Sequence, residues 1–403
     1  MPPSFAIDDL KYGYYTYKDQ IYFNRQDAFD VMLATGDYAG QVKFHFNDDI
    51  FSSIDWSKKI DVDISDLYKQ RAQQLRDSHK YLILAFSGVS DSTQILCTFL
   101  KNNIFLDEIQ VICSEKAISK LDRSMLLADN EFQNFLEYER AVVPMLKIIR
   151  ERSPNTKINI VDVSDFIVDQ LSKNKMEYFV SNPKYSLKPS DYVVNQMPRV
   201  ESYILMTTNR HNDKDSVALI RGIEKPMIFN HRTEIISNFC SMSLNVIFNF
   251  KKGLLEPSFT MENFFWSREV PLITVKQSQM LKEKMELDKA YCIRFIEIRK
   301  KINLAIIEKK NWLGLTYALE RMYSNVIYPD WNPHTFIATK PSTVLPENKL
   351  VKHLTGNNYV DKLNKEMQEV QLKKYEKLEN QKQLYGAIFS KFYSLGKLQL
   401  QWR

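Results

Sequence analysis

Glycine, cysteine and histidine are sparse in this chain of 403 residues, and their scarcity excludes several classes of site. Only ten glycines are present, so a glycine found in a turn indicates a backbone requirement. The four cysteines form no CxxC pair, which argues against a zinc ribbon or a thioredoxin-like redox pair and is typical of a reducing compartment. The six histidines show neither HxxxH nor HExxH spacing, so no histidine-based metal site is indicated.

Long apolar runs and targeting signals are also missing. No apolar window approaches the roughly 18 residues of a membrane span, so we expect no contact with a membrane. The N-terminus MPPSFAIDDLKYG lacks a basic stretch followed by an apolar one, so no signal peptide is predicted. We therefore expect a cytoplasmic protein, in the cytoplasm of its own cell or of a host. The absence of GxxxxGK[ST], GxGxxG and GxSxG argues against a Walker A loop, a dinucleotide fingerprint and a hydrolase nucleophile elbow.

The hydropathy pattern divides the chain into three predicted regions. Residues 1–75 are predicted to form a small α+β unit. Residues 76–235 alternate apolar strands with helices, which is typical of an α/β domain with a mostly parallel sheet and helices on both faces. Residues 236–403 are predicted to be mainly helical. The strands of the middle region are predicted at 81–86, 108–114, 157–163 and 215–222.

A long amphipathic helix is predicted over residues 360–395. Its apolar stripe is more typical of core packing or of an oligomer contact than of a membrane face, so a homo-oligomer joined through this helix is one expectation. Residues 360–403 carry nine Lys or Arg against five Asp or Glu. This excess fits a solvated helix face, and a nucleic-acid contact through the basic tail stays open as the alternative.

The stretch Ser-Gly-Val-Ser-Asp-Ser, residues 87–92, follows the strand predicted at 81–86 and opens the next helix. A helix N-terminus offers unpaired N–H groups and the positive end of its dipole, and small residues let an anion approach them. Ser90 or Asp91 can cap this helix. The first strand-to-helix turn of an open parallel sheet is also where ligands usually bind. The pattern therefore favours a phosphate-binding loop over an ordinary turn.

The stretch resembles the PP-loop signature SGGxDS of the ATP pyrophosphatase superfamily, which includes the synthetase domain of asparagine synthetases. Ser87, Gly88, Asp91 and Ser92 match the signature, Ser90 fills its free position, and Val89 replaces the second glycine. The resemblance covers about residues 75–235 and implies a PP-loop or HUP-like α/β fold. If the second glycine position requires a positive φ or bare backbone beside the phosphate, the β-branched Val89 is unfavourable there.

The resemblance also implies how the site works. The family binds ATP and Mg²⁺, with the loop holding the phosphates. Asp91 would order the Mg²⁺ ion or the phosphates, in keeping with the preference of hard cations for carboxylate oxygens. The end of the second strand, at Cys113 and Ser114, would bind adenosine mainly through backbone groups. The Cys113 side chain could be a sulfur carrier, but a small core residue is the favoured reading. The implied phosphate-binding residues are Ser87, Gly88, Val89, Ser90, Ser92 and Thr93.

A second candidate segment is LIRGIEKPMIF, residues 219–229. It places Gly222, Glu224 and Lys225 just after a predicted strand, at the carboxyl edge of the sheet. In PP-loop enzymes a later loop supplies a base or a lysine to the pyrophosphate, so Lys225 or Arg221 would stabilise the leaving charge. Glu224 would hold Mg²⁺ or the substrate amine. The alternative is a surface turn with a local ion pair.

The resemblance implies an enzyme that adenylates a carboxylate or carbonyl oxygen of an unknown acceptor and releases pyrophosphate. An amine or other nucleophile would then attack, as in an amidoligase or a nucleobase or nucleotide modification. Residue 2 is Pro2, and only about 80 residues precede the loop, so no glutamine amidohydrolase domain is expected. The chain also resembles the stand-alone PP-loop proteins of tailed-phage genomes. Two alternatives stay open, namely a catalytically degenerate nucleotide-binding or assembly module and a nucleic-acid-modifying enzyme.

Overall fold

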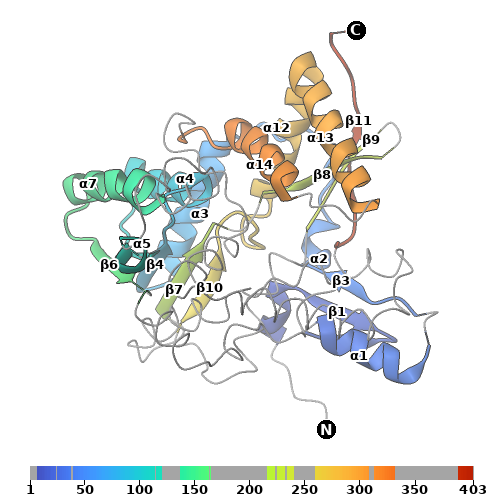
Figure 1. The fold of residues 1–403 in the computed structure, drawn as a ribbon, viewed down its shortest axis with the longest axis horizontal. Helices are drawn as coiled ribbons and strands as arrows, with labels where there is room; N and C mark the ends of the chain where they lie inside the picture. Colours follow the sequence, from blue (N-terminus) through green and yellow to red (C-terminus); the bar gives the residue numbers. More distant parts are fainter. Residues whose placement is uncertain are drawn as a thin grey trace.

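The computed structural model describes a central parallel sheet, a small N-terminal unit and a C-terminal part that contains both helices and strands (Figure 1). It describes residues 7–23, 25–37, 40–113, 115–119, 137–162, 164, 216–222, 225–231, 234–239, 259–307, 313–331 and 389–402.

The central sheet has five strands, all parallel, in the order β10-β7-β4-β5-β6. The strands predicted in the middle region are confirmed as four of them, and β10 was not predicted. Counted by their order in the chain, the strands from β6 across the sheet to β10 are the third, second, first, fourth and fifth. This is the strand order of doubly wound nucleotide-binding sheets. This finding confirms the predicted α/β class with a parallel sheet. The strands are β4 (Tyr81–Ala85), β5 (Glu108–Cys113), β6 (Lys157–Asp162), β7 (Val217–Arg221) and β10 (Thr260–Asn263).

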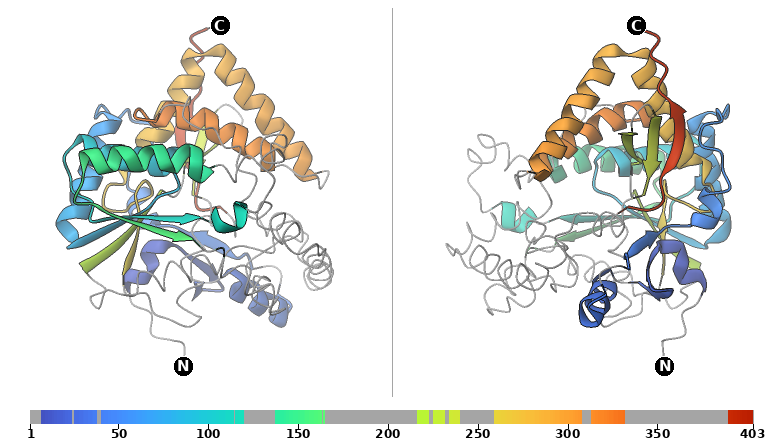
Figure 2. Two further views of the ribbon diagram at one scale, coloured as in Figure 1. Left: turned by 60° about the vertical axis from the view of Figure 1, so that its left-hand side comes forward. Right: turned by 90° about the vertical axis from the view of Figure 1, so that its right-hand side faces the viewer.

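Both faces of the sheet are buried, which explains why β4 is apolar throughout. Leu82 and Leu84 belong to the main hydrophobic core, whereas Ile83 belongs to a second cluster that includes Tyr12. Successive side chains of a strand point to opposite faces, so β4 fills both clusters. On the main-core side the sheet is covered by α4 and α7, as Figure 2 shows. The helices nearest this sheet are α3 (Ile64–Ser78), α4 (Ser90–Lys101), α5 (Glu115–Ile118) and α7 (Val143–Arg152).

The N-terminal unit is an antiparallel sheet of order β2-β1-β3 with short helices, in keeping with the predicted α+β character. Its aromatic side chains share a core with later segments. Phe46 and Phe51 lie 4.6 and 4.5 Å, centroid to centroid, from the ring of Phe239. Its elements are η1 (Ile7–Tyr12), β1 (Tyr14–Tyr17), β2 (Gln20–Tyr22), α1 (Arg25–Thr35), β3 (Lys43–His45) and α2 (Asp48–Phe51).

The C-terminal region departs from the mainly helical prediction for residues 236–403. Three helices agree with it, but β10 joins the central sheet, and β8, β9 and β11 form an antiparallel sheet of order β11-β9-β8. The predicted boundary at 235 falls within β9. The elements are β8 (Met227–His231), β9 (Glu234–Asn238), α12 (Leu272–Leu287), α13 (Lys289–Ile307), α14 (Leu313–Ile327) and β11 (Tyr393–Lys397).

The end of the helix predicted over 360–395 is also wrong. Residues 360–388 lie outside the described residues, and Tyr393 opens a strand rather than closing a helix. Tyr393 pairs with Ser237 of β9, and its ring stacks on Trp56 at 4.6 Å with an interplanar angle of 8°. Pairing with a strand distant in sequence therefore decides the conformation of this segment, and a helical spacing of apolar residues does not report such pairing.

Candidate functional site

The loop after β4 lies at the point where the sheet changes direction. From β4 the chain continues to β5 and β6 on one side, whereas β7 and β10 lie on the other side. Ligands of open α/β sheets bind at the carboxyl ends of the strands at such a switch point. Because β4 and β7 are parallel neighbours, with Leu84 paired to Ile220, their carboxyl ends lie side by side. The two segments singled out in the sequence, 87–93 and 219–229, therefore meet at this edge.

The loop backbone requires glycine at position 88 and not at position 89. Gly88 has a φ of +76°, whereas Val89 has φ −87° and ψ 176°, an ordinary extended conformation. A Cβ at position 88 would lie 2.9 Å from the carbonyl carbon of Ala141, so the loop packs closely against the π-helical turn η3 (Tyr138–Val142). The φ-based objection to Val89 is thereby removed.

The first turn of α4 has no side-chain cap. The N-cap is Val89, which has no acceptor, so the prediction that Ser90 or Asp91 caps the helix is wrong. The first intrahelical bond runs from the Thr93 N–H to the Val89 carbonyl at 2.9 Å. The N–H groups of residues 90–92 consequently have no carbonyl partner one turn earlier, and they lie at the positive end of the helix dipole. This is the arrangement that binds phosphates at helix N-termini.

The hydroxyl groups of the loop have two different environments. Ser92 Oγ accepts a bond from the Ser87 N–H at 3.2 Å, lies 3.2 Å from Ser87 Oγ and donates to the Val89 carbonyl at 3.3 Å. These bonds hold the loop closed on itself. Thr93 is only 7% exposed, and its hydroxyl has no hydrogen-bond partner among the described residues. Such a buried orphan hydroxyl is unfavourable unless a ligand or water completes it.

Asp91 and Lys225 form a largely buried ion pair. Lys225 Nζ lies 2.8 Å from Asp91 Oδ1 and 2.9 Å from Oδ2. The lysine side chain is 8% exposed and the aspartate side chain 24%. Gly222 permits this approach, because a Cβ there would lie 2.8 Å from Asp91 Cβ. The alternative reading of residues 219–229 was a surface turn with a local ion pair. It is wrong about the partner, because Lys225 pairs with Asp91 of the 87–93 loop.

The remaining predicted residues divide into two groups. Glu224 and Ser114 lie outside the described residues. Cys113 ends β5, where it pairs with Asp162 of β6. Burial raises the pKa of its thiol to about 11, and the neighbouring Asp162 and Glu115 carboxylates act in the same direction. The thiol is therefore protonated at neutral pH, which agrees with a packing role rather than with a sulfur nucleophile.

Three residues that the sequence did not single out approach the loop from the end of α14. The Tyr328 hydroxyl donates to Asp91 Oδ1. The Ser324 hydroxyl donates to Ser90 Oγ at 3.1 Å. Asp330 accepts a bond from the Gln94 side chain at 3.0 Å, and its N–H donates back to Gln94 Oε1 at 3.0 Å. No local motif marks these residues, because they contact the loop only through the tertiary fold.

A single carboxylate at the loop fits Mg²⁺ only together with phosphate ligands. Within the described parts of the chain, no group of three or more His, Cys, Asp or Glu residues is arranged to hold a metal. Mg²⁺ is usually held by one or two carboxylates plus substrate phosphates and water, so Asp91 beside an uncapped helix N-terminus fits that mode of binding.

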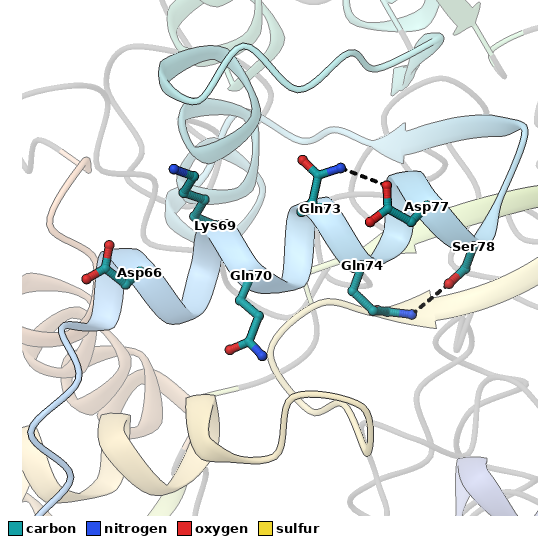
Figure 3. A pocket seen from close by; sticks show the side chains of 7 residues that line it. All are labelled: Asp66, Lys69, Gln70, Gln73, Gln74, Asp77 and Ser78. Atoms are coloured by element: carbon teal, nitrogen blue, oxygen red, sulfur yellow. Dashed lines mark hydrogen bonds between the residues drawn. The ribbon is translucent and has the colours of Figure 1, made fainter.

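A hollow of about 530 Å³ lies elsewhere, on the outer surface of α3 (Figure 3). Among the described residues its lining comes from one face of α3, where hydrogen bonds link Gln73 to Asp77 and Gln74 to Ser78. None of its lining residues comes from a strand end. It therefore has no part in the site at the carboxyl edge of the sheet.

Two further findings extend beyond the site. No helix in the described ranges is long and apolar enough to cross a membrane. Comparison with protein-family models gave no match, and comparison with curated protein sequences gave none either.

Proposed function

We propose that this chain is an ATP-pyrophosphatase-type enzyme that adenylates a carboxylate or carbonyl oxygen of an acceptor molecule. The observation that carries the proposal is the convergence of an uncapped helix N-terminus, a carboxylate and an ammonium group at one strand edge. The N-terminus provides donors for phosphate oxygens, Asp91 provides a ligand for a cation, and Lys225 provides a compensating positive charge. The buried hydroxyl of Thr93, which has no partner among the described residues, adds a donor beside the same turn.

The proposed reaction has two steps. In the first, an acceptor oxygen attacks the α-phosphorus of ATP, the bond to the bridging oxygen breaks, and its electron pair leaves with pyrophosphate. In the second, an amine or another nucleophile attacks the acceptor carbon, and AMP leaves with the electrons of the carbon–oxygen bond. An amine nucleophile then loses its proton to water. The chain's own contribution is electrostatic, because preorganised donors stabilise charge that develops on the departing pyrophosphate.

Lys225 is the residue best placed for that role. Its side chain is only 8% exposed, and its ammonium group lies within 3 Å of the Asp91 carboxylate in the first turn of α4. In a desolvated position a positive charge interacts with a phosphate more strongly than it would in water. Mg²⁺, held at Asp91, would neutralise further phosphate charge.

The test is a product analysis with ATP labelled in the α- or the γ-phosphate, in the presence of Mg²⁺ and a panel of carboxylate and nucleobase acceptors. We expect AMP and pyrophosphate. We expect Asp91→Asn and Lys225→Met to lower the rate by about 10²-fold or more, as loss of a transition-state donor does. Asp66→Asn, which alters an exposed carboxylate on α3, is the matched control. ADP and phosphate as products would contradict the proposal.

One observation favours the second candidate, a catalytically degenerate PP-loop protein that acts as a binding or assembly module. Both oxygens of Asp91 already accept bonds from Lys225, so the carboxylate is satisfied without a metal ion. Calorimetry with Mg²⁺ and a non-hydrolysable ATP analogue, read together with the product analysis, separates the candidates. Tight binding that Asp91→Asn abolishes, with release of AMP and pyrophosphate from ATP, supports the enzyme. Tight binding without that release supports a degenerate nucleotide-binding module, and an absence of binding supports an assembly module.

A further inference from the structure

Tyr328 contacts both charged residues of the loop site from a distant part of the chain. It is 237 positions from Asp91 and follows directly on α14. Its hydroxyl donates to Asp91 Oδ1, and its ring lies under Lys225, whose Nζ is 5.7 Å from the ring centroid. Tyr328 itself is only 2% exposed. One side chain thus supplies a hydrogen bond to the anion and a π face to the cation.

Tyr328 is itself firmly held. Its ring lies 5.0 Å from that of Phe265, centroid to centroid, and its N–H donates to the Ser324 carbonyl at 3.1 Å. On either side of it, Ser324 bonds to Ser90 and Asp330 bonds to Gln94. These contacts fix the end of α14 along the first turns of α4. The orientation of the Tyr328 hydroxyl is therefore determined by the packing of the helices around it and not by Asp91 alone.

We propose that Tyr328 is a positioning residue of the loop site, which keeps Asp91 oriented when Lys225 leaves it for a phosphate. A carboxylate has about four lone-pair positions. Lys225 and Tyr328 together engage three of them in this structure. When a bound nucleotide draws the ammonium group away, the tyrosine bond remains and leaves the vacated oxygen positions directed at the site. The movement of Lys225 from Asp91 to a phosphate rests on the proposed function. The bond by which Tyr328 orients Asp91 in the ligand-free protein does not.

The first test measures the reactivity of Lys225 without nucleotide. Each lysine is acylated with a limiting reagent, and the labelling of Lys225 is divided by that of Lys276, whose ammonium group donates to the Ile60 carbonyl at 2.6 Å. Tyr328→Phe retains the ring and removes the hydroxyl. We expect this variant to raise the ratio by about tenfold, the change that 1.4 kcal/mol produces in an equilibrium. Tyr291→Phe is the control, since it removes a hydroxyl that donates to the Met322 carbonyl at 3.3 Å.

The ratio cancels a general loosening of the fold, because such loosening would expose both lysines. A ratio in Tyr328→Phe equal to that in Tyr291→Phe would overturn the role of Tyr328. A second measurement is calorimetric titration with Mg²⁺ and a non-hydrolysable ATP analogue, in which we expect Tyr328→Phe alone to weaken binding by about tenfold. A wild-type protein that binds no nucleotide would contradict the proposed function, while the labelling ratio would still decide the role of Tyr328.

Discussion

Removing the ammonium group of Lys225 should destabilise the protein more than removing both charges of its ion pair. Lys225→Met leaves the Asp91 carboxylate partly buried, with the Tyr328 hydroxyl as a remaining donor. Loss of one partner from a fully buried pair costs about 3–5 kcal/mol. Because the Asp91 side chain is 24% exposed, we expect a smaller loss, of about 2–3 kcal/mol. Asp91→Asn in the same chain removes the uncompensated charge, so the double variant should lie within about 1 kcal/mol of wild type.

Urea unfolding followed by circular dichroism measures these changes as shifts of the midpoint at constant slope. The double-mutant cycle isolates the coupling between the two residues. Asp66→Asn again serves as the control, because Asp66 lies on the exposed face of α3 (Figure 3). Additive effects of Lys225→Met and Asp91→Asn, or a loss below about 0.5 kcal/mol for Lys225→Met, would refute the ion pair as a buried, coupled element.

Three further predictions concern the loop and its surroundings. Gly88→Ala should destabilise the protein by about 1–3 kcal/mol more than Gly36→Ala does, as measured by thermal or urea unfolding. Both glycines have a positive φ, but only the Cβ added at position 88 would meet Ala141. Equal losses of stability in the two variants would contradict this packing. Val89→Ser should add an N-cap acceptor to α4 and raise the stability by about 0.5–2 kcal/mol. It should also weaken nucleotide binding, since the serine hydroxyl competes with phosphate for the same N–H groups. A rise in both stability and nucleotide affinity would count against phosphate binding at this turn. Burial raises the pKa of the Cys113 thiol to about 11, so it should react slowly with iodoacetamide at pH 7.5 and faster as the pH approaches 11. Peptide mass spectrometry follows the alkylation. Fast alkylation at pH 7.5 would contradict the burial of this thiol.

The sequence predicted those parts of the site whose residues follow one another in a short, continuous stretch of chain. The strand β4, the loop and α4 follow one another within about twenty residues, so hydropathy and turn chemistry reveal them together. Lys225 could be placed at the same edge because it follows another apolar strand, and parallel strands end on one side of a sheet. Its partner could not be predicted, because spacing along a sequence does not show which strands become neighbours.

The missed features depend on contacts between distant segments. Tyr328 reaches Asp91 only because α14 lies against α4, and nothing in its local sequence reports this packing. The strand β11 was predicted as the end of a helix, because Phe389 and Phe392 fit a helical stripe. In the structure both rings lie against Phe229 of β8, at 5.5 and 6.3 Å between centroids. A tertiary partner therefore overrode the local pattern.

Val89 was predicted to be unfavourable if its position requires a positive φ. In the structure that requirement falls on the neighbouring Gly88. The positive φ falls on Gly88, which matches the family signature, and Val89 has an extended backbone that any residue adopts. What distinguishes this loop is therefore the missing N-cap acceptor and the lysine already bound to Asp91. Both features bear on whether a phosphate can bind.

A crystal structure of the protein with Mg²⁺ and a non-hydrolysable ATP analogue tests the central claim most directly. The account predicts phosphate oxygens on the N–H groups of residues 90–92, with Lys225 moved from Asp91 to a phosphate and the bond between Tyr328 and Asp91 retained. Nucleotide bound elsewhere, with the bonds between Lys225 and both oxygens of Asp91 intact at saturation, would contradict it.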